Sequence, residues 1–164
     1  MMARGCVGAA VMIVALAACA AQPVAQGQAA QPGEVSSRAA VTWQGHALRA
    51  VGSLAALPAP IRKALGADRP GLDGIAEKGA PFNATDAIVD DHPMRRFITA
   101  GHDGDTWLVA FEQGGIAHTV TAVEISGGVQ RRGWSLGCCM STLAEVVQQI
   151  SAASPGQSFT PVAP

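Results

Sequence analysis

Residues 95–136, RRFITAGHDGDTWLVAFEQGGIAHTVTAVEISGGVQRRGWSL, decide the fold of this chain. Four runs of β-branched, aromatic and other apolar residues are separated by GHDGD at 101–105 and by Gly-Gly at 114–115 and 127–128. Gly-Gly supplies the positive φ angles that tight hairpin turns require. The pattern therefore predicts an antiparallel β-meander of four strands over about residues 95–136.

The same turns predict how the strands pair. With a loop at 114–115, Phe111 lies opposite His118, and with GHDGD as the first turn, Ala100 lies opposite Trp107. Because side chains alternate along a strand, one face of this sheet is expected to form the core. The expected core face holds Ile98, Ala100, Trp107, Val109, Phe111, Val120 and Ala122, with His118 at its edge. The expected outer face holds Thr99, Leu108, Ala110, Glu112, Thr119 and Thr121.

An amphipathic helix is predicted after the sheet, over about residues 142–152. Thr142 and Glu145 have the spacing of a capping box, which satisfies free N–H groups at a helix start. The residues that follow place an apolar stripe at helical spacing: Leu143, Val146, Val147 and Ile150. We expect this stripe to cover the core face of the sheet.

A shorter helix is predicted near residues 58–66. Pro60 suits the first turn of a helix, and Gly66 suits its end. The long stretch from Pro70 to Pro93 is rich in Gly, Pro and Asp, which favours a structured loop. Together these elements predict an α+β domain, in which a small four-stranded meander is backed by helices.

An apolar segment near the start of the chain is too short to span a bilayer. It runs from Val7 to Ala18, about a dozen residues, whereas a transmembrane helix needs about 20. Arg4 precedes this segment and small residues follow it. That layout is typical of a secretory signal peptide.

The end of this segment, LAAC at 16–19, resembles the lipobox of bacterial lipoproteins. The resemblance covers the first 19 residues alone and implies cleavage between Ala18 and Cys19. Cys19 would then carry a diacylglycerol on its thiol and an acyl chain on its new amino group, and several chains anchor firmly. Because Ala20 follows the cysteine, resemblance to enterobacterial sorting implies the outer membrane, with the protein facing the periplasm. The alternative is an ordinary signal peptide that is cleaved elsewhere, for instance after Ala21.

These features divide the chain into four parts. Residues 1–18 are expected to form the signal peptide, and residues 19–39 the lipidated cysteine with a flexible tether rich in Ala, Gln and Pro. About 20 such residues reach roughly 25 Å. The single globular domain is expected over 40–153, and residues 154–164 are expected to be a disordered tail.

Charge gives no indication of a nucleic-acid partner. The net charge is −1, and where arginines are adjacent they form the pairs Arg95-Arg96 and Arg131-Arg132 rather than longer runs. Nucleic-acid binding calls for a basic face. We interpret both pairs as solvated strand positions, and expect the partners to be the membrane, through the lipid, and another envelope protein.

Cys138 and Cys139 are the cysteines that remain after the signal peptide and the lipidated residue are set aside. Adjacent Cα atoms lie about 3.8 Å apart, below the usual disulfide range of about 4.4 to 6.8 Å. Three interpretations stay open: inert thiols, a vicinal or intermolecular disulfide, and a thiolate pair for a soft metal. The second and third would make the chain a thiol-redox or metal-responsive protein.

Two groups of residues have side chains that suit acid–base or metal chemistry. Asp90, Asp91 and His92 precede the first strand of the meander, and His118 lies at the start of the third run. A small hydrolase or metal-dependent enzyme that uses either group is one hypothesis. The simpler interpretation is that the acidic group forms a turn and that His118 is a core-edge residue.

No catalytic motif accompanies these residues. The sequence has no Gly-x-Ser-x-Gly elbow, no phosphate loop and no dinucleotide fingerprint. No cofactor is therefore expected. The sequence favours a non-enzymatic binding module that is tethered to the envelope and uses either the outer sheet face or the loop from Pro70 to Pro93.

Overall fold

The computed structural model describes residues 40–161, which belong to one compact unit of the chain. The predictions for residues 1–39, including those for Ala18 and Cys19, concern residues outside the described part of the chain. Within 40–161, no helix is long and apolar enough to cross a membrane. The helices are α1 (Ala59–Leu65) and α2 (Leu143–Ala152), with short 3-10 turns η1 (Gly71–Asp73) and η2 (Pro155–Gln157). The strands are β1 (Val41–Trp43), β2 (His46–Val51), β3 (Ile75–Ala76), β4 (Arg95–Asp103), β5 (Thr106–Gln113), β6 (Thr119–Ser126), β7 (Val129–Leu136) and β8 (Ser158–Phe159).

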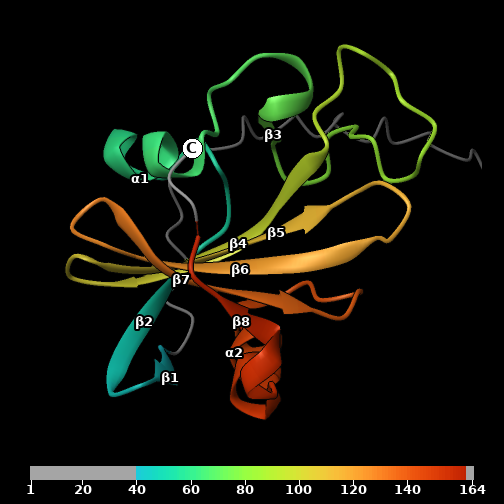
Figure 1. Cartoon of the computed structure of the whole chain (residues 1–164). Coiled ribbons are helices and arrows are strands. Elements are labelled where there is room, and N and C mark those ends of the chain that lie inside the picture. The colour runs from blue at the N-terminus through green and yellow to red at the C-terminus, as the bar shows by residue number, and fades with distance from the viewer. Residues whose placement is uncertain (1–39, 162–164) are drawn as a thin grey trace, which may run out of the picture. The chain divides into compact units, whose positions relative to one another are not determined.

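The α+β class is confirmed, but the sheet is larger than a four-stranded meander. It has eight strands in the order β1-β2-β4-β5-β6-β7-β8, and β3 pairs with β4 off this path. The predicted meander is its centre, where β4 to β7 are consecutive antiparallel neighbours (Figure 1). The prediction missed β1, β2, β3 and β8, each of which pairs with any one neighbour over only two or three residues. Such short pairings leave little periodic pattern to detect in the sequence.

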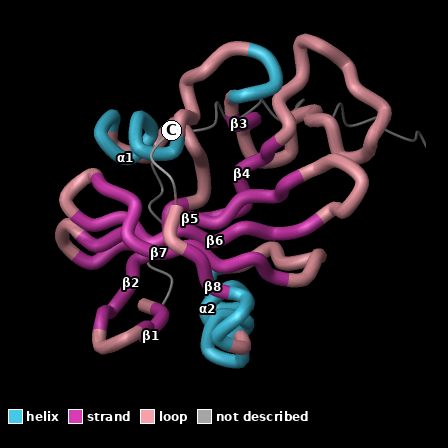
Figure 2. Tube along the Cα trace, viewed as in Figure 1, coloured by secondary structure: helices cyan, strands magenta, loops and turns pink. Residues whose placement is uncertain are grey.

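Both predicted helices are present and begin and end as expected. Gly66 ends α1 in the left-handed conformation, with a φ of 63°, and the Thr142 and Glu145 capping box begins α2. The whole apolar stripe of α2 is buried: Leu143, Val146, Val147 and Ile150. The two helices cover opposite faces of the sheet (Figure 2).

The expected division into one core face and one outer face is wrong. The face under α2 includes Leu108 and Ala110, which are 0% and 1% exposed. The face under α1 includes Val109 and Phe111, which are also buried. The sheet is therefore covered on both sides, and the predicted outer face is not available as a docking surface.

The strand register explains this error. Phe111 pairs with Thr121 rather than with His118, because the loop between β5 and β6 takes five residues, 114–118, in place of two. A shift by an odd number of residues moves every side chain of a strand to the other face. Val120 and Ala122 therefore lie under α2, not beside Phe111.

Strand β4 changes face along its length. Its register with β5 shifts between Phe97 and Thr99, which marks a β-bulge. A bulge adds one residue to one strand, so alternation restarts beyond it. Ile98 consequently packs under α2 while Ala100 packs under α1, although the regular alternation predicted one face for both.

The end of the described chain is part of the sheet. β8 pairs with β7 through Gly133 and Phe159, and the Phe159 ring lies so close to Gly133 that a Cβ there would collide with it. Sheet pairing thus extends past residue 153, where the sequence placed the domain boundary, into the segment that was expected to be disordered.

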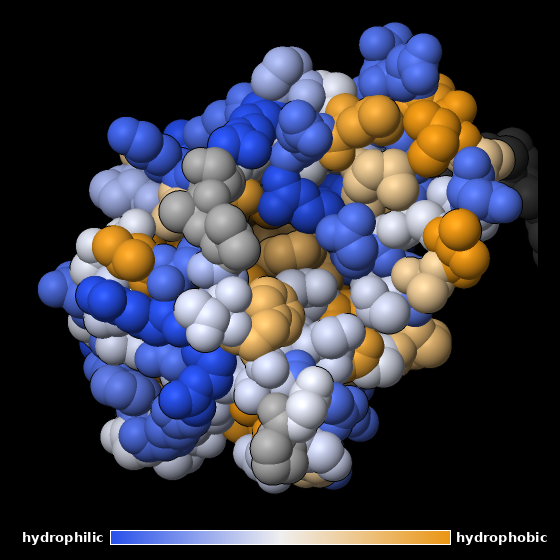
Figure 3. Space-filling model, viewed as in Figure 1, coloured by the Kyte–Doolittle hydropathy of each residue, from blue (hydrophilic) through white to orange (hydrophobic). Residues whose placement is uncertain are grey.

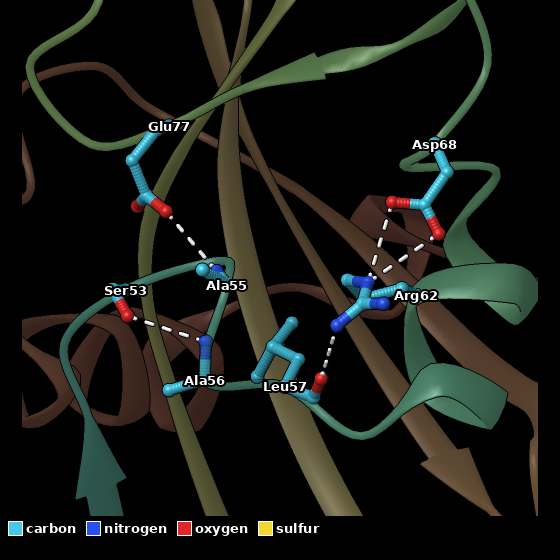
Figure 4. A network of polar contacts seen from close by, with 7 residues as sticks. All are labelled: Ser53, Ala55, Ala56, Leu57, Arg62, Asp68 and Glu77. Carbon is cyan, nitrogen blue, oxygen red and sulfur yellow. Dashed lines mark hydrogen bonds and ion pairs between the residues drawn. The ribbon is translucent and has the colours of Figure 1, made fainter.

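Backbone groups before α1 are satisfied by two charged side chains (Figure 4). The Glu77 carboxylate accepts hydrogen bonds from the N–H groups of Leu54 (2.8 Å) and Ala55 (3.0 Å). Arg62 donates to the Leu57 carbonyl (2.9 Å) and pairs with Asp68 (3.3 Å). These contacts fix the position of α1 over the sheet.

Candidate functional site

A cavity of about 690 Å³ opens on the α1 side of the sheet, in the range of small-molecule sites. Figure 3 shows a hollow near the centre of this face, with hydrophilic residues along its upper side. The lining comes from α1, the loop after it, β4 to β7 and the end of the chain: Leu65, Arg69, Leu72, Asp73, Met94, Arg95, Phe111, Gln113, Thr121, Val123, Gln130, Phe159 and Pro161.

Strand alternation produces the mixed character of this cavity. Phe111 and Val123 are buried apolar residues, while Gln113 and Thr121 follow them on the same side of β5 and β6 toward the strand ends. Phe159, which is 43% exposed, lines the cavity from β8. The site therefore offers apolar surface together with a few polar groups.

Arg95 is a structural cation in the cavity wall. Its guanidinium donates to the carbonyls of Leu65 (3.0 Å) and Gly74 (3.3 Å), and also to the Asp73 carbonyl. It lies over the Phe111 ring, with 5.5 Å from Cζ to the centroid. These contacts link α1 and η1 to β4, so Arg95 is not the solvated strand residue that the sequence indicated.

The electrostatics of the wall favour a negative ligand. Burial, followed by the positive charge of Arg69, lowers the pKa of Arg95, whereas the carboxylate of Asp73 raises it. Arginine nevertheless stays protonated. The lining residues carry two guanidinium groups and one carboxylate, which leaves a positive surplus beside an apolar surface.

Arg69 supplies that surplus charge at the exposed side of the cavity. Its guanidinium has no hydrogen-bond or ion-pair partner within residues 40–161. A Cβ added at Gly66 would lie 3.2 Å from the Arg69 Nε, so the guanidinium end of this side chain packs over Gly66 in the αL turn after α1. The guanidinium is thus positioned near the cavity and free to receive an anion.

A second polar cluster lies where β4 begins and β5 ends, next to the pair of Arg95 and Gln113. Glu112 pairs with Arg96, with 2.5 Å between Oε2 and Nε, and also with His118, with 3.5 Å between Oε1 and Nε2. Phe82 contacts both partners, 4.2 Å from the Arg96 Cζ and 5.9 Å from the His118 ring. The expectation that Glu112 and His118 lie on opposite faces is therefore wrong, and so is the solvated position expected for Arg96.

His118 itself lies in the loop before β6 and is exposed, not at the edge of the core. The five-residue loop lets it turn back toward Glu112, which a two-residue loop would not allow. The pair is one histidine beside one carboxylate, and Arg96 already satisfies that carboxylate. The cluster therefore links the end of β5 to the start of β4 and to the loop before β6.

Asp90, Asp91 and His92 belong to the loop before β4, as expected. Asn83, only 3% exposed, organises this loop by donating to the carbonyls of Val89 (3.0 Å) and His92 (2.5 Å). Within residues 40–161 no three His, Cys, Asp or Glu side chains are grouped so that they could hold a metal ion. The metal-dependent alternative thus has no three-residue ligand set in this part of the chain.

Cys138 and Cys139 are exposed and unlinked, in the segment between β7 and α2. The soft-metal interpretation has no third ligand among the described residues. The disulfide interpretation remains a prediction.

No protein-family model matches the chain, and neither a curated protein nor a solved structure shows a significant match. The function must therefore be argued from the residues themselves.

The sequence did not reveal the cavity. Its lining residues come from many separate segments, and the loop after α1 and the β8 segment were expected to be irregular. Two signals were available in the sequence. One was the position of Arg69 after the short helix, and the other was the alternation in Phe111-Gln113 and Thr121-Val123, which places polar residues at the end of an apolar face.

Proposed function

We propose that this protein is a lipid-anchored envelope module that binds a small anionic molecule with an apolar body, without catalysing a reaction. The observation that carries the proposal is the cavity of about 690 Å³ in which Arg69, whose guanidinium is unpaired within residues 40–161, lies beside apolar lining. An arginine beside apolar surface suits carboxylates, sulfonates and phosphates on hydrocarbon or aromatic groups.

The binding proposal depends on the contrast between the two arginines of the wall. Each of the three guanidinium nitrogens of Arg95 donates to a backbone carbonyl, and these bonds keep the wall in place. Arg69 makes no such bond within the described residues, so its charge is available to a ligand. One arginine builds the site and the other would recognise the anion.

Naphthalene-2-sulfonate and the uncharged 2-naphthalenemethanol form a matched pair of probes. Titration calorimetry of the full chain should show one saturable site with a several-fold higher affinity for the sulfonate. Arg69→Gln should reduce the affinity for the sulfonate about three- to tenfold, because a partly exposed ion pair contributes about 1 kcal/mol. The affinity for the uncharged alcohol should stay the same. Arg131→Gln, which changes an exposed arginine outside the cavity lining, is the control.

Two results would overturn the proposal. If neither probe binds saturably, the cavity is not a ligand site for this class. If the sulfonate binds equally to the wild type and to Arg69→Gln, the anion is not recognised by this residue.

The membrane anchor rests on the lipobox resemblance and needs a separate test. Cys19→Ser should abolish labelling with a radioactive fatty acid and leave the precursor unprocessed. A variant that is still processed and localised normally would contradict lipidation at Cys19. Ser36→Ala, in the expected tether, provides the control for expression.

A further inference from the structure

The segment that joins β7 to α2 presents two thiols on an anchored backbone. Cys138 and Cys139 are both exposed, while Leu136 and Leu143 at its ends are 3% and 4% exposed. The Glu145 carboxylate also accepts a hydrogen bond from the Ser141 N–H, at 2.8 Å. The two thiols are therefore held at the surface by a segment with fixed ends.

Cys139 has an unusual backbone conformation. Its φ is 74°, and among residues 40–161 the other non-glycine residue with positive φ is Gln44. Gln44 lies in the two-residue turn between β1 and β2, which requires that conformation. Cys139 lies outside any such hairpin, and the left-handed conformation costs a residue with a Cβ about 1 kcal/mol or more. Strain of this kind often accompanies a functional position.

The two thiol side chains interact with each other. A hydrogen bond with the Cys138 side chain is the main factor that raises the pKa of the Cys139 thiol, and the carboxylate of Glu112 acts in the same direction. Because the thiolate is the nucleophile in disulfide exchange, whichever sulfur loses its proton attacks first, and the adjacent thiol lies beside it to complete the disulfide.

We propose that Cys138 and Cys139 form a redox-labile pair that low-molecular-weight disulfides oxidise reversibly to a disulfide between these adjacent residues. In the first step the thiolate of one cysteine attacks a disulfide RSSR, forms a mixed disulfide with one RS group and releases RS⁻. In the second step the other cysteine loses its proton, attacks the protein sulfur of that mixed disulfide and displaces the second RS⁻. The net reaction converts two protein thiols and one RSSR into one protein disulfide and two RSH.

Reversibility follows from the spacing of the two residues. Their Cα atoms are about 3.8 Å apart, whereas disulfides usually join Cα atoms about 4.4 to 6.8 Å apart. A strained disulfide has a higher reduction potential and is reduced more readily than a structural one. The oxidised pair would therefore respond to the thiol balance of its surroundings.

Oxidised glutathione and peptide mass analysis test this proposal on the full chain. Trypsin cleaves after Arg132, and no Lys or Arg follows in residues 133–164, so the peptide that begins at Gly133 contains Cys138 and Cys139 and no other cysteine. After incubation and rapid alkylation, the wild-type peptide should carry neither an alkyl group nor glutathione. Its mass should be two hydrogens below that of the unalkylated peptide with both thiols free. Dithiothreitol should restore both thiols.

Single variants test whether the second thiol completes the disulfide. Cys139→Ser should accumulate a stable glutathione adduct on Cys138, and Cys138→Ser should accumulate one on Cys139, because each variant lacks the resolving thiol. Wild-type protein that accumulates glutathione on either cysteine, remains fully reduced, or forms a disulfide-linked dimer would overturn the proposal. The assay uses no cavity ligand, so its outcome is independent of the proposed binding function.

Discussion

Leu143, the first residue of α2, packs directly on the backbone of Gly101 in β4. A Cβ on Gly101 would collide with the Cδ2 methyl group of Leu143, and it would lie 3.1 Å from both the Leu143 Cδ1 and the Leu48 Cβ. The absence of a side chain in β4 thus lets the first turn of α2 approach the sheet closely. This contact fixes the helix on the face opposite the cavity.

Gly101→Ala should destabilise the protein by about 1 to 3 kcal/mol, because an added methyl group in a packed core forces its neighbours apart. Urea unfolding followed by circular dichroism measures the change. Gly52→Ala is the matched control, since a Cβ at Gly52 meets nothing within 4 Å. If both variants have the same stability, α2 does not pack against β4 as described.

Asn83→Ala should loosen the loop before β4. The variant loses the two hydrogen bonds that the Asn83 amide donates to the Val89 and His92 carbonyls. It also loses the hydrogen bond that the Val89 N–H donates to Asn83 Oδ1 (2.8 Å). We expect a loss of about 1 to 3 kcal/mol and faster hydrogen exchange at the Val89 amide. Thr85→Ala removes one exposed bond, to the Ala87 N–H, and should leave exchange at Val89 unchanged. Unchanged exchange in Asn83→Ala would contradict the role of this side chain.

Glu77 should make stability depend on pH. Burial raises the pKa of its carboxyl, but hydrogen bonds from the N–H groups of Leu54, Lys78 and Ala55 together outweigh burial, so the pKa is lowered overall. A carboxyl whose pKa is lower in the folded state stabilises the protein above its unfolded-state pKa. This contribution is lost as the pH falls through the folded-state pKa.

Glu77→Gln should therefore be less stable than the wild type at neutral pH, by about 1 to 2 kcal/mol, and the difference should shrink in acid. Urea unfolding at a series of pH values gives the two curves. Asp86→Asn, at an exposed loop position, serves as the control. A difference between Glu77→Gln and the wild type that is constant with pH would argue against the lowered pKa.

Local signals predicted local elements well. Both helices were predicted from features that act within a few residues of the chain. These features are the capping box of Thr142 and Glu145 for α2 and the glycine after Leu65 for α1. The four long strands were predicted for the same reason, since alternation and Gly-Gly turns are properties of neighbouring residues.

Pairing over longer distances was harder to predict. A buried Gly114, which donates to the Met94 carbonyl at 2.8 Å, belongs to the loop between β5 and β6, and its close contact with Asn83 leaves no room for a Cβ. Nothing near Gly114 in the sequence reveals a partner that lies about 30 residues earlier. The resulting three-residue register shift exchanged the faces of β6 and concealed both the cavity and the pair of Glu112 with His118.

Filling the cavity is the most direct test of the proposed binding function. Thr121 lines the cavity from β6, so Thr121→Trp should occupy space that a ligand needs. Thr42→Trp is the matched control, because Thr42 is exposed on β1 and does not line the cavity. Circular dichroism first establishes that both variants are folded.

The deciding measurement is a calorimetric titration of the three proteins with naphthalene-2-sulfonate. The wild type and Thr42→Trp should bind one equivalent with the same affinity, and folded Thr121→Trp should bind at least tenfold more weakly. Equal binding by folded Thr121→Trp, or no saturable binding by the wild type, would contradict a ligand site in this cavity.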